Sequence, residues 1–214
     1  MKTATKVRLR FAKRGDLRLV SHHDLLRCLE RMLRRAALPL AYSQGFNPRP
    51  KVVFTLALAL GIEGRHEVVE LELIEPVEPS EVVDRLRRVS PSGLDWLEAE
   101  AVAPGRPAHA AAVAYQIDIP AGRRAAAQVA LDRFLACDHW PFTRHRPDRG
   151  VDVAVDLRPF VLDAELDLIG GLRFRLKIEP SGSARPEELL EILGLRDLLG
   201  QGAVLVRTEM ELAP

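Results

Sequence analysis

The order of strand-like and helix-like segments restricts the fold of this chain more than any other feature. Residues 6–11 alternate basic and apolar side chains, which predicts a strand with one buried face. A helix follows between Ser21 and Pro39, because apolar side chains recur there at three- and four-residue spacing. The next segments predict two strands, a helix that begins at Ser80 and a last strand, at residues 52–60, 67–74, 80–89 and 94–102.

This βαββαβ order is typical of the ferredoxin-like unit. After a Pro- and Gly-containing linker, a similar order recurs: a strand, a helix, a long β region, a helix and a strand, at residues 113–119, 123–136, 151–178, 185–193 and 203–212. We therefore expect an α+β fold of two tandem ferredoxin-like units, with mostly antiparallel sheets and helices on one face. The domains would be residues 1–102 and 113–214, joined by a linker at 103–112.

Residues 163–167 and 173–177 carry alternating acidic and alternating basic side chains, respectively. A loop at residues 169–171 would pair these charges across a hairpin, with Asp167 opposite Arg173 and Glu165 opposite Arg175. The basic stripe of residues 173–177 is therefore assigned to structure and not to ligand binding.

Charge is distributed unevenly along the 214 residues, although the net charge is only +1. Residues 1–51 hold 13 Lys/Arg and 3 Asp/Glu, a balance of +10, while the remainder holds 18 and 27, a balance of −9. The basic end should attract polyanions, which favours a nucleic-acid contact there. The alternative is that this segment pairs with the protein's own carboxylates.

Other class signals are weak. The first residues contain no apolar signal-peptide core, and the most apolar stretch, residues 52–60, is too short to span a bilayer. We expect a cytoplasmic protein that does not bind membranes. Cys28 and Cys137 are the only cysteines, too few for an iron–sulfur cluster and wrongly spaced for zinc, so no metal or cofactor is expected.

The predicted helix at Ser21–Pro39 carries basic residues on its polar face, and these are candidates for phosphate contact: Arg27, Arg31, Arg34 and Arg35. The alternative is a solvated face, partly neutralised by Glu30. His22 and His23 lie at the start of this helix, where an anion can bind and the pKa of an imidazole falls. Either could act as a general acid or base, or one could simply pack while the other is solvated.

The loop that follows has aromatic, amide and basic side chains that suit stacking on unpaired bases: Tyr42, Phe46, Asn47, Arg49 and Lys51. Alternatively, Phe46 fills the core and Asn47 only makes a turn. In the predicted sheet, the basic side chains of residues 6–10 would lie beside Glu70 and Glu72, and ion pairs could neutralise them. We therefore expect RNA contacts through the helix and the loop, and not through the sheet.

Residues 10–25 and 34–51 resemble the radical SAM-linked domain of unknown function, with the pattern F-x-K-x-G-x-L-R-x-x-S-H-x-D and then R-R-A-x-L-P-x-A-Y-S-x-G-F-N-P-H-P-K. The resemblance covers residues 8–75. His22 matches the pattern, whereas His23 stands where Leu is usual and Arg49 replaces a His. The resemblance implies a protein encoded beside, or fused to, a radical SAM enzyme. This chain lacks the CxxxCxxC cluster motif and so is not that enzyme.

The predicted tandem ferredoxin-like architecture also resembles that of CRISPR repeat-processing endoribonucleases, which can cleave RNA without metal. That similarity nominates His22, Tyr42 and Lys51 as catalytic residues. Three functions follow as expectations. The first is an RNA-binding accessory protein for a radical SAM partner, acting in tRNA, rRNA or ribosome modification. The second is a metal-independent endoribonuclease, and the third is a protein–protein adaptor for the radical SAM enzyme.

Overall fold

The computed structural model describes residues 5–146, 150–167 and 169–213. The chain divides into two compact units, the first comprising Met1–Ala110 with Val206–Pro214 and the second Ala111–Leu205. Within the described ranges, no helix is long and apolar enough to cross a membrane. The predicted α+β class with mostly antiparallel sheets is confirmed.

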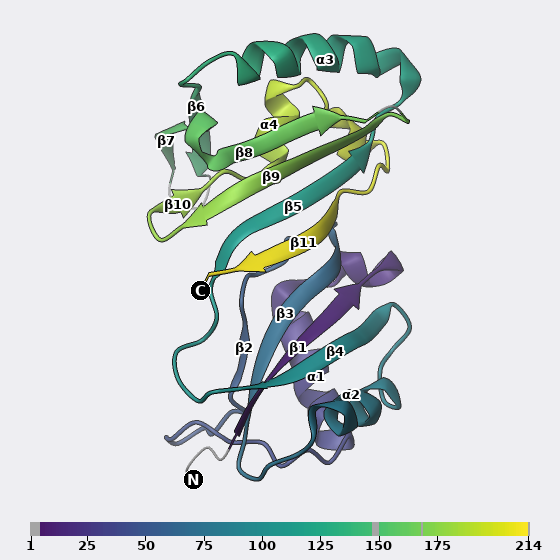
Figure 1. Ribbon diagram of the computed structural model, residues 1–214, viewed down its shortest axis with the longest axis vertical. Helices are drawn as coiled ribbons and strands as arrows, with labels where there is room; N and C mark the ends of the chain where they lie inside the picture. Colours follow the sequence, from purple (N-terminus) through teal and green to yellow (C-terminus); the bar gives the residue numbers. More distant parts are fainter. Residues whose placement is uncertain (1–4, 147–149, 168, 214) are drawn as a thin grey trace. The chain divides into compact units, whose positions relative to one another are not determined.

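The first unit is built around a sheet in which β3 is the longest strand (Figure 1). Its strands are β1 (Thr5–Lys13), β2 (Val52–Phe54), β3 (Glu63–Leu73), β4 (Leu94–Val102) and β11 (Val206–Leu212). The spatial order is β4-β1-β3-β2, and every neighbouring pair in it is antiparallel. β11 runs parallel to β3 and pairs with its first residues.

Two helices, α1 (His22–Arg35) and α2 (Pro79–Arg87), pack on one face of this sheet (Figure 1). A short 3₁₀ helix, η1 (Gly15–Leu19), leads from β1 to α1. The Ser21 hydroxyl caps α1 by accepting a hydrogen bond of 3.2 Å from the Asp24 backbone N–H. The core between helices and sheet contains Leu25, Leu29, Met32 and Leu33 of α1, Val82, Val83 and Leu86 of α2, and Val7, Leu9 and Phe11 of β1. The apolar periodicities predicted the buried residues of α1 and β1 in this set.

The second unit has β9 as its central strand, antiparallel to β8 on one side and β5 on the other. Its elements are β5 (Ala110–Asp118), α3 (Ala121–Leu135), β6 (Pro141–Arg146), β7 (Val151–Asp156), η2 (Arg158–Phe160), β8 (Val161–Leu166), β9 (Gly171–Glu179), β10 (Gly182–Ser183), α4 (Pro186–Ile192) and α5 (Asp197–Gly200). β6 and β7 form a separate two-stranded sheet, whose first strand the sequence pattern did not predict.

Several element boundaries differ from those predicted. β2 ends at Phe54 and not at residue 60, and β3 begins at Glu63. The N-cap of α2 is Glu78 and not Ser80, two residues earlier than expected, because Pro79 fits the first helical position. The last strand belongs to the first unit, since β11 pairs with β3 and the Ala213 N–H donates to the His109 carbonyl at 2.8 Å.

The charged hairpin forms with a different register from the one predicted. Asp163 lies opposite Arg175 and Glu165 opposite Arg173. The loop begins earlier because Asp167 closes it: its carboxylate accepts the backbone N–H groups of Ile169 and Gly171 at 3.1 and 2.7 Å. Opposite charges still meet across the strands, with a distance of 3.1 Å between Arg175 Nη1 and Asp163 Oδ2.

Candidate nucleic-acid interface

The polar face of α1 carries four exposed arginines. Arg27 lies 3.4 Å from the Asp24 carboxylate, which is one turn earlier on the helix. The other three, Arg31, Arg34 and Arg35, form no ion pair or side-chain hydrogen bond with any residue that the structure describes, and we call them the α1 arginine patch. The expected neutralisation by Glu30 is not observed within these ranges.

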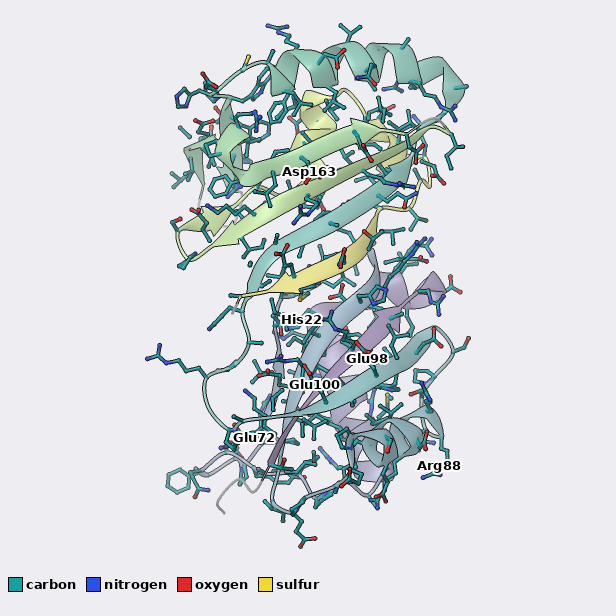
Figure 2. All side chains as sticks on the ribbon, in the orientation of Figure 1. His22, Glu72, Arg88, Glu98, Glu100 and Asp163 are labelled. Atoms are coloured by element: carbon teal, nitrogen blue, oxygen red, sulfur yellow. The ribbon has the colours of Figure 1, made fainter. Side chains whose placement is uncertain are left out.

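The basic side chains of the sheet, by contrast, are paired: Glu70 is a partner as predicted, whereas Glu72 pairs with Lys51 and the carboxylates of β4 supply the other partners. Arg8 contacts Glu70 at 3.0 Å and Glu100 at 3.1 Å, and Arg10 lies 3.3 Å from Glu98. Lys6 lies 2.5 Å from the same Glu70 carboxylate. Glu98 and Glu100 of β4 are labelled in Figure 2. This face of the sheet therefore offers little uncompensated positive charge to a polyanion.

Glu70 is the centre of that neutralisation. Burial alone would raise the pKa of its carboxyl group, but hydrogen bonds from Lys6, the Ala108 backbone N–H and Arg8 outweigh burial and hold the pKa below its usual value. The carboxylate is thus charged at neutral pH and binds two cations of β1. The sequence predicted that Glu70 would lie beside these cations because Lys6, Arg8 and Arg10 alternate along one strand.

The loop between α1 and β2 has a defined base and an exposed tip. The Ser43 N–H donates to the Arg49 carbonyl at 2.8 Å, and Tyr42 forms an isolated β-bridge with Pro50. Phe46 is fully exposed, at 104 % relative accessibility, so it does not fill the core. A bare aromatic ring at the tip of a closed loop is available to stack on an unpaired base.

The loop's other candidates differ in their availability. Asn47 and Arg49 are exposed, and Tyr42 is 38 % exposed. The Arg49 guanidinium has no ion pair or hydrogen bond among the described residues. Lys51 is held by Glu72, with 2.6 Å between its Nζ and the carboxylate, so its charge is already compensated inside the protein.

His22 is the first residue of α1, and its half-buried ring packs edge-on against Phe54, with 5.1 Å between ring centroids. Burial lowers the pKa of His22, and the neighbouring His23 and Lys13 lower it further. The direction agrees with the expectation for a helix start, although the main cause is burial. His22 is therefore mostly neutral at pH 7.

The structure does not bring the three nominated catalytic residues together. His22 begins a helix of 14 residues, about 20 Å long, and Tyr42 lies beyond the other end of that helix. Figure 2 shows His22 well apart from Glu72, the residue that binds Lys51. A general acid or base has to lie within hydrogen-bond reach of its partner, directly or through one water. These residues are not so arranged.

A buried charged cluster beside His22 was not predicted. Arg207 of β11 pairs with Glu67 of β3 through two hydrogen bonds, one of 2.8 Å from Nε, and both side chains are at most 3 % exposed. Lys13 is fully buried and donates to the Val20 carbonyl at 2.8 Å. Desolvation lowers the pKa of Lys13, against the attraction of Glu67. The pairing spans 140 residues, so no local pattern could reveal it.

Gly64 makes room for this cluster. A Cβ atom at that position would lie 2.5 Å from Cγ and Oε1 of Glu67. The guanidinium of Arg207 also donates to the Ala57 carbonyl at 3.1 Å, which ties β11 to the segment after β2. The cluster is thus a structural clamp that holds the chain's last strand against β3, at the end of the sheet where His22 lies.

The comparison with protein families is decisive for one point. The sequence profile of a family described as an uncharacterized protein conserved in bacteria (DUF2344) matches residues 6–186. The chain belongs to this family. The matched residues include α1, the loop and most of both units, so the α1 arginine patch and the loop tip are part of the family's own domain.

The other comparisons add little. No curated protein matches the chain. Among solved structures, the chain is similar to an unknown protein from Galdieria sulphuraria, at 10 % identity and a TM-score of 0.30, with 98 % of this chain and 99 % of that chain covered.

Both cysteines are free and half-buried, and within the described ranges no group of three or more His, Cys, Asp or Glu side chains could hold a metal ion.

Proposed function

We propose that this family member is a cytoplasmic RNA-binding accessory protein that presents a tRNA, rRNA or ribosomal substrate to a radical SAM enzyme. The observation that supports RNA binding is the contrast between two basic surfaces of one unit. The cations of β1 are neutralised by carboxylates of β3 and β4, whereas the α1 arginine patch has no carboxylate partner among the described residues.

The chemistry of the patch suits phosphate. A guanidinium presents a planar fork of donors that matches phosphate oxygens, and it also stacks on bases. The exposed ring of Phe46 and the unpaired Arg49 lie on the loop that α1 leads into, so the helix and the loop together offer both backbone contacts and a stacking surface. Single-stranded or loop RNA is the substrate class that such a combination favours.

The radical SAM partner is supported by the resemblance of residues 10–25 and 34–51 to the radical SAM-linked domain. A tandem ferredoxin-like architecture is supported by the order β4-β1-β3-β2 in the first unit and by β8-β9-β5 in the second. The separation of His22 from Tyr42 and Lys51 gives no support to the endoribonuclease alternative.

RNA binding can be tested by fluorescence anisotropy with a labelled single-stranded RNA. Arg31→Glu/Arg34→Glu should lose most of the affinity. A charge-matched control is Arg65→Glu/Arg106→Glu, because both of these arginines are exposed, lie in the first unit and are outside the patch. Equal affinity of the patch variant and the parent, or equal loss in both double variants, would exclude the patch as the RNA contact.

The same samples separate the alternative functions. Cleavage of the RNA during incubation, abolished by His22→Ala, would favour the endoribonuclease. Co-purification of a radical SAM protein without nucleic acid, judged from the 260/280 nm absorbance ratio, would favour the adaptor. Intact RNA, bound through the patch, is the result that the proposal requires.

A further inference from the structure

A groove of about 390 Å³ lies between α1 and the segment that follows α2. One wall is a single face of α1, formed by Cys28, Arg31, Met32 and Arg35, which are spaced by three, one and three residues. The other wall is the segment Arg88, Val89, Ser90 and Pro91. The whole groove is therefore made within the first unit, by side chains that the helical spacing and the end of α2 bring together.

Three guanidiniums surround the groove. Arg31, Arg35 and Arg88 are all exposed, and none has an ion pair or a side-chain hydrogen bond to a residue within the described part of the chain. Arg88 is labelled beside α2 in Figure 2. Asp84, one turn before Arg88, is instead paired with Arg87 at 3.8 Å.

Among the residues that the structure describes, no carboxylate lines the groove to neutralise these charges. Glu30 is the acidic residue of α1 nearest in sequence, but at about 100° per residue it faces away from Cys28 and Arg35. Three like charges around one hollow repel one another, so a bound anion would relieve that repulsion as well as form hydrogen bonds.

The groove also has an apolar part, which a simple anion would not need. Val89 is half-buried and Pro91 exposed, and they form its apolar surface over the buried Met32, which is only 2 % exposed. The Ser90 hydroxyl is already engaged, donating to the Leu86 carbonyl at 2.8 Å and accepting from Trp96 Nε1 at 2.9 Å, so it fixes the wall. The volume lies within the range of small-molecule sites.

We propose that this groove binds one nucleotide, with its phosphate among the three guanidiniums and its base or ribose against Val89 and Pro91. The proposal deepens the RNA-binding function proposed above and takes the nucleotide from the bound RNA. Arg88, which the sequence did not nominate, then acts with Arg31 and Arg35 as a phosphate-binding residue, although it comes from a different element.

The test is isothermal titration calorimetry of the purified protein with uridine 5′-monophosphate. Uridine, which lacks the phosphate, is the control ligand. Arg88→Glu and Arg35→Glu should each weaken binding of the monophosphate at least about tenfold, and uridine should bind neither variant nor parent measurably. Arg106→Glu is the charge-matched control outside the groove and should leave the affinity within about twofold.

A second measurement uses the parent protein and therefore does not depend on whether a variant folds. Cys28 lines the groove and Cys137 lies in the other unit, so the monophosphate should slow alkylation of Cys28 while the rate at Cys137 stays unchanged. No binding of the monophosphate by the parent, unchanged affinity in Arg88→Glu, or equal protection of both thiols would overturn the proposal.

Competition separates this inference from the function on which it rests. Displacement of a labelled RNA by the monophosphate would support the inference that a nucleotide of that RNA lies in the groove. Binding of the monophosphate without displacement would contradict RNA as the source of the nucleotide. RNA binding by a parent protein that does not bind the monophosphate would refute the groove and leave the RNA proposal standing. Binding of the monophosphate by a protein that does not bind RNA would refute the RNA proposal, and with it RNA as the source of the nucleotide, while the groove would stand as a site for a free nucleotide.

Discussion

The salt dependence of RNA binding follows from which cations the fold leaves unpaired. Each phosphate contact to single-stranded RNA contributes about −0.7 to the slope of log affinity against log salt. Taken apart from the groove, with one phosphate for each cation, the α1 arginine patch and Arg49 provide four cations that have no partner among the described residues, so the expected slope is about −2.8. If all 13 Lys/Arg of residues 1–51 took part, the slope would be about −9.

The predicted slope converts to an affinity change that anisotropy can measure. Between 50 and 200 mM salt, affinity should fall about 50-fold for the parent. Arg31→Glu/Arg34→Glu leaves two contacts and a slope of about −1.4, which corresponds to about sevenfold over the same range. Arg14→Gln is the control, because Arg14 is paired with Asp95 at 2.5 Å and should not change the slope. A flat parent response, or a variant slope equal to that of the parent, would refute this reasoning.

Three further predictions concern the buried cluster and His22. Glu67→Gln leaves Arg207 buried without its counter-ion and should lower the free energy of unfolding in urea by about 3–5 kcal/mol; a loss below about 1 kcal/mol, typical of an exposed pair, would contradict a buried clamp. Gly64→Ala should destabilise by forcing the Glu67 carboxylate aside, whereas Gly122→Ala, with open space around its Cβ position, should not; the same urea titration compares them. Because the folded state lowers the pKa of His22, the unfolded chain binds more protons between the two pKa values, so stability should rise with pH across the interval below 6.5, and an NMR titration midpoint at or above 6.5 would rule this out.

The parts of the fold that the sequence predicted are those set by local periodicity. The apolar face of α1 and the alternation of residues 6–11 both follow from which neighbours share a side of the element, and both were found in the structure. The ion pair of Arg8 with Glu70 was foreseeable for the same reason, once β1 was placed beside β3, whereas the pairs of Arg8 with Glu100 and of Arg10 with Glu98 come from β4 and were not predicted. The register predicted for the charged hairpin was wrong because the side chain of Asp167 closes the loop. The alternation of charges does not indicate that contact.

The parts that were not predicted depend on contacts between distant residues. Arg207 and Glu67 form an ion pair only because β11 pairs with β3, and no sequence pattern at either position predicts that pair. Arg88 joins Arg31 and Arg35 because α2 ends near the face of α1, and that closeness is set by packing in the core. The separation of His22 from Lys51 was hidden likewise, since their distance depends on the length and direction of α1.

The most direct test of the central claim is ultraviolet cross-linking of the protein to single-stranded RNA, with the attached peptides identified by mass spectrometry. The account predicts cross-links at Phe46 and Tyr42, and their loss in Arg31→Glu/Arg34→Glu, because the loop and the α1 arginine patch form one RNA-binding surface. Cross-links confined to β1 and β4, where the cations are paired, or to the second unit, would contradict it.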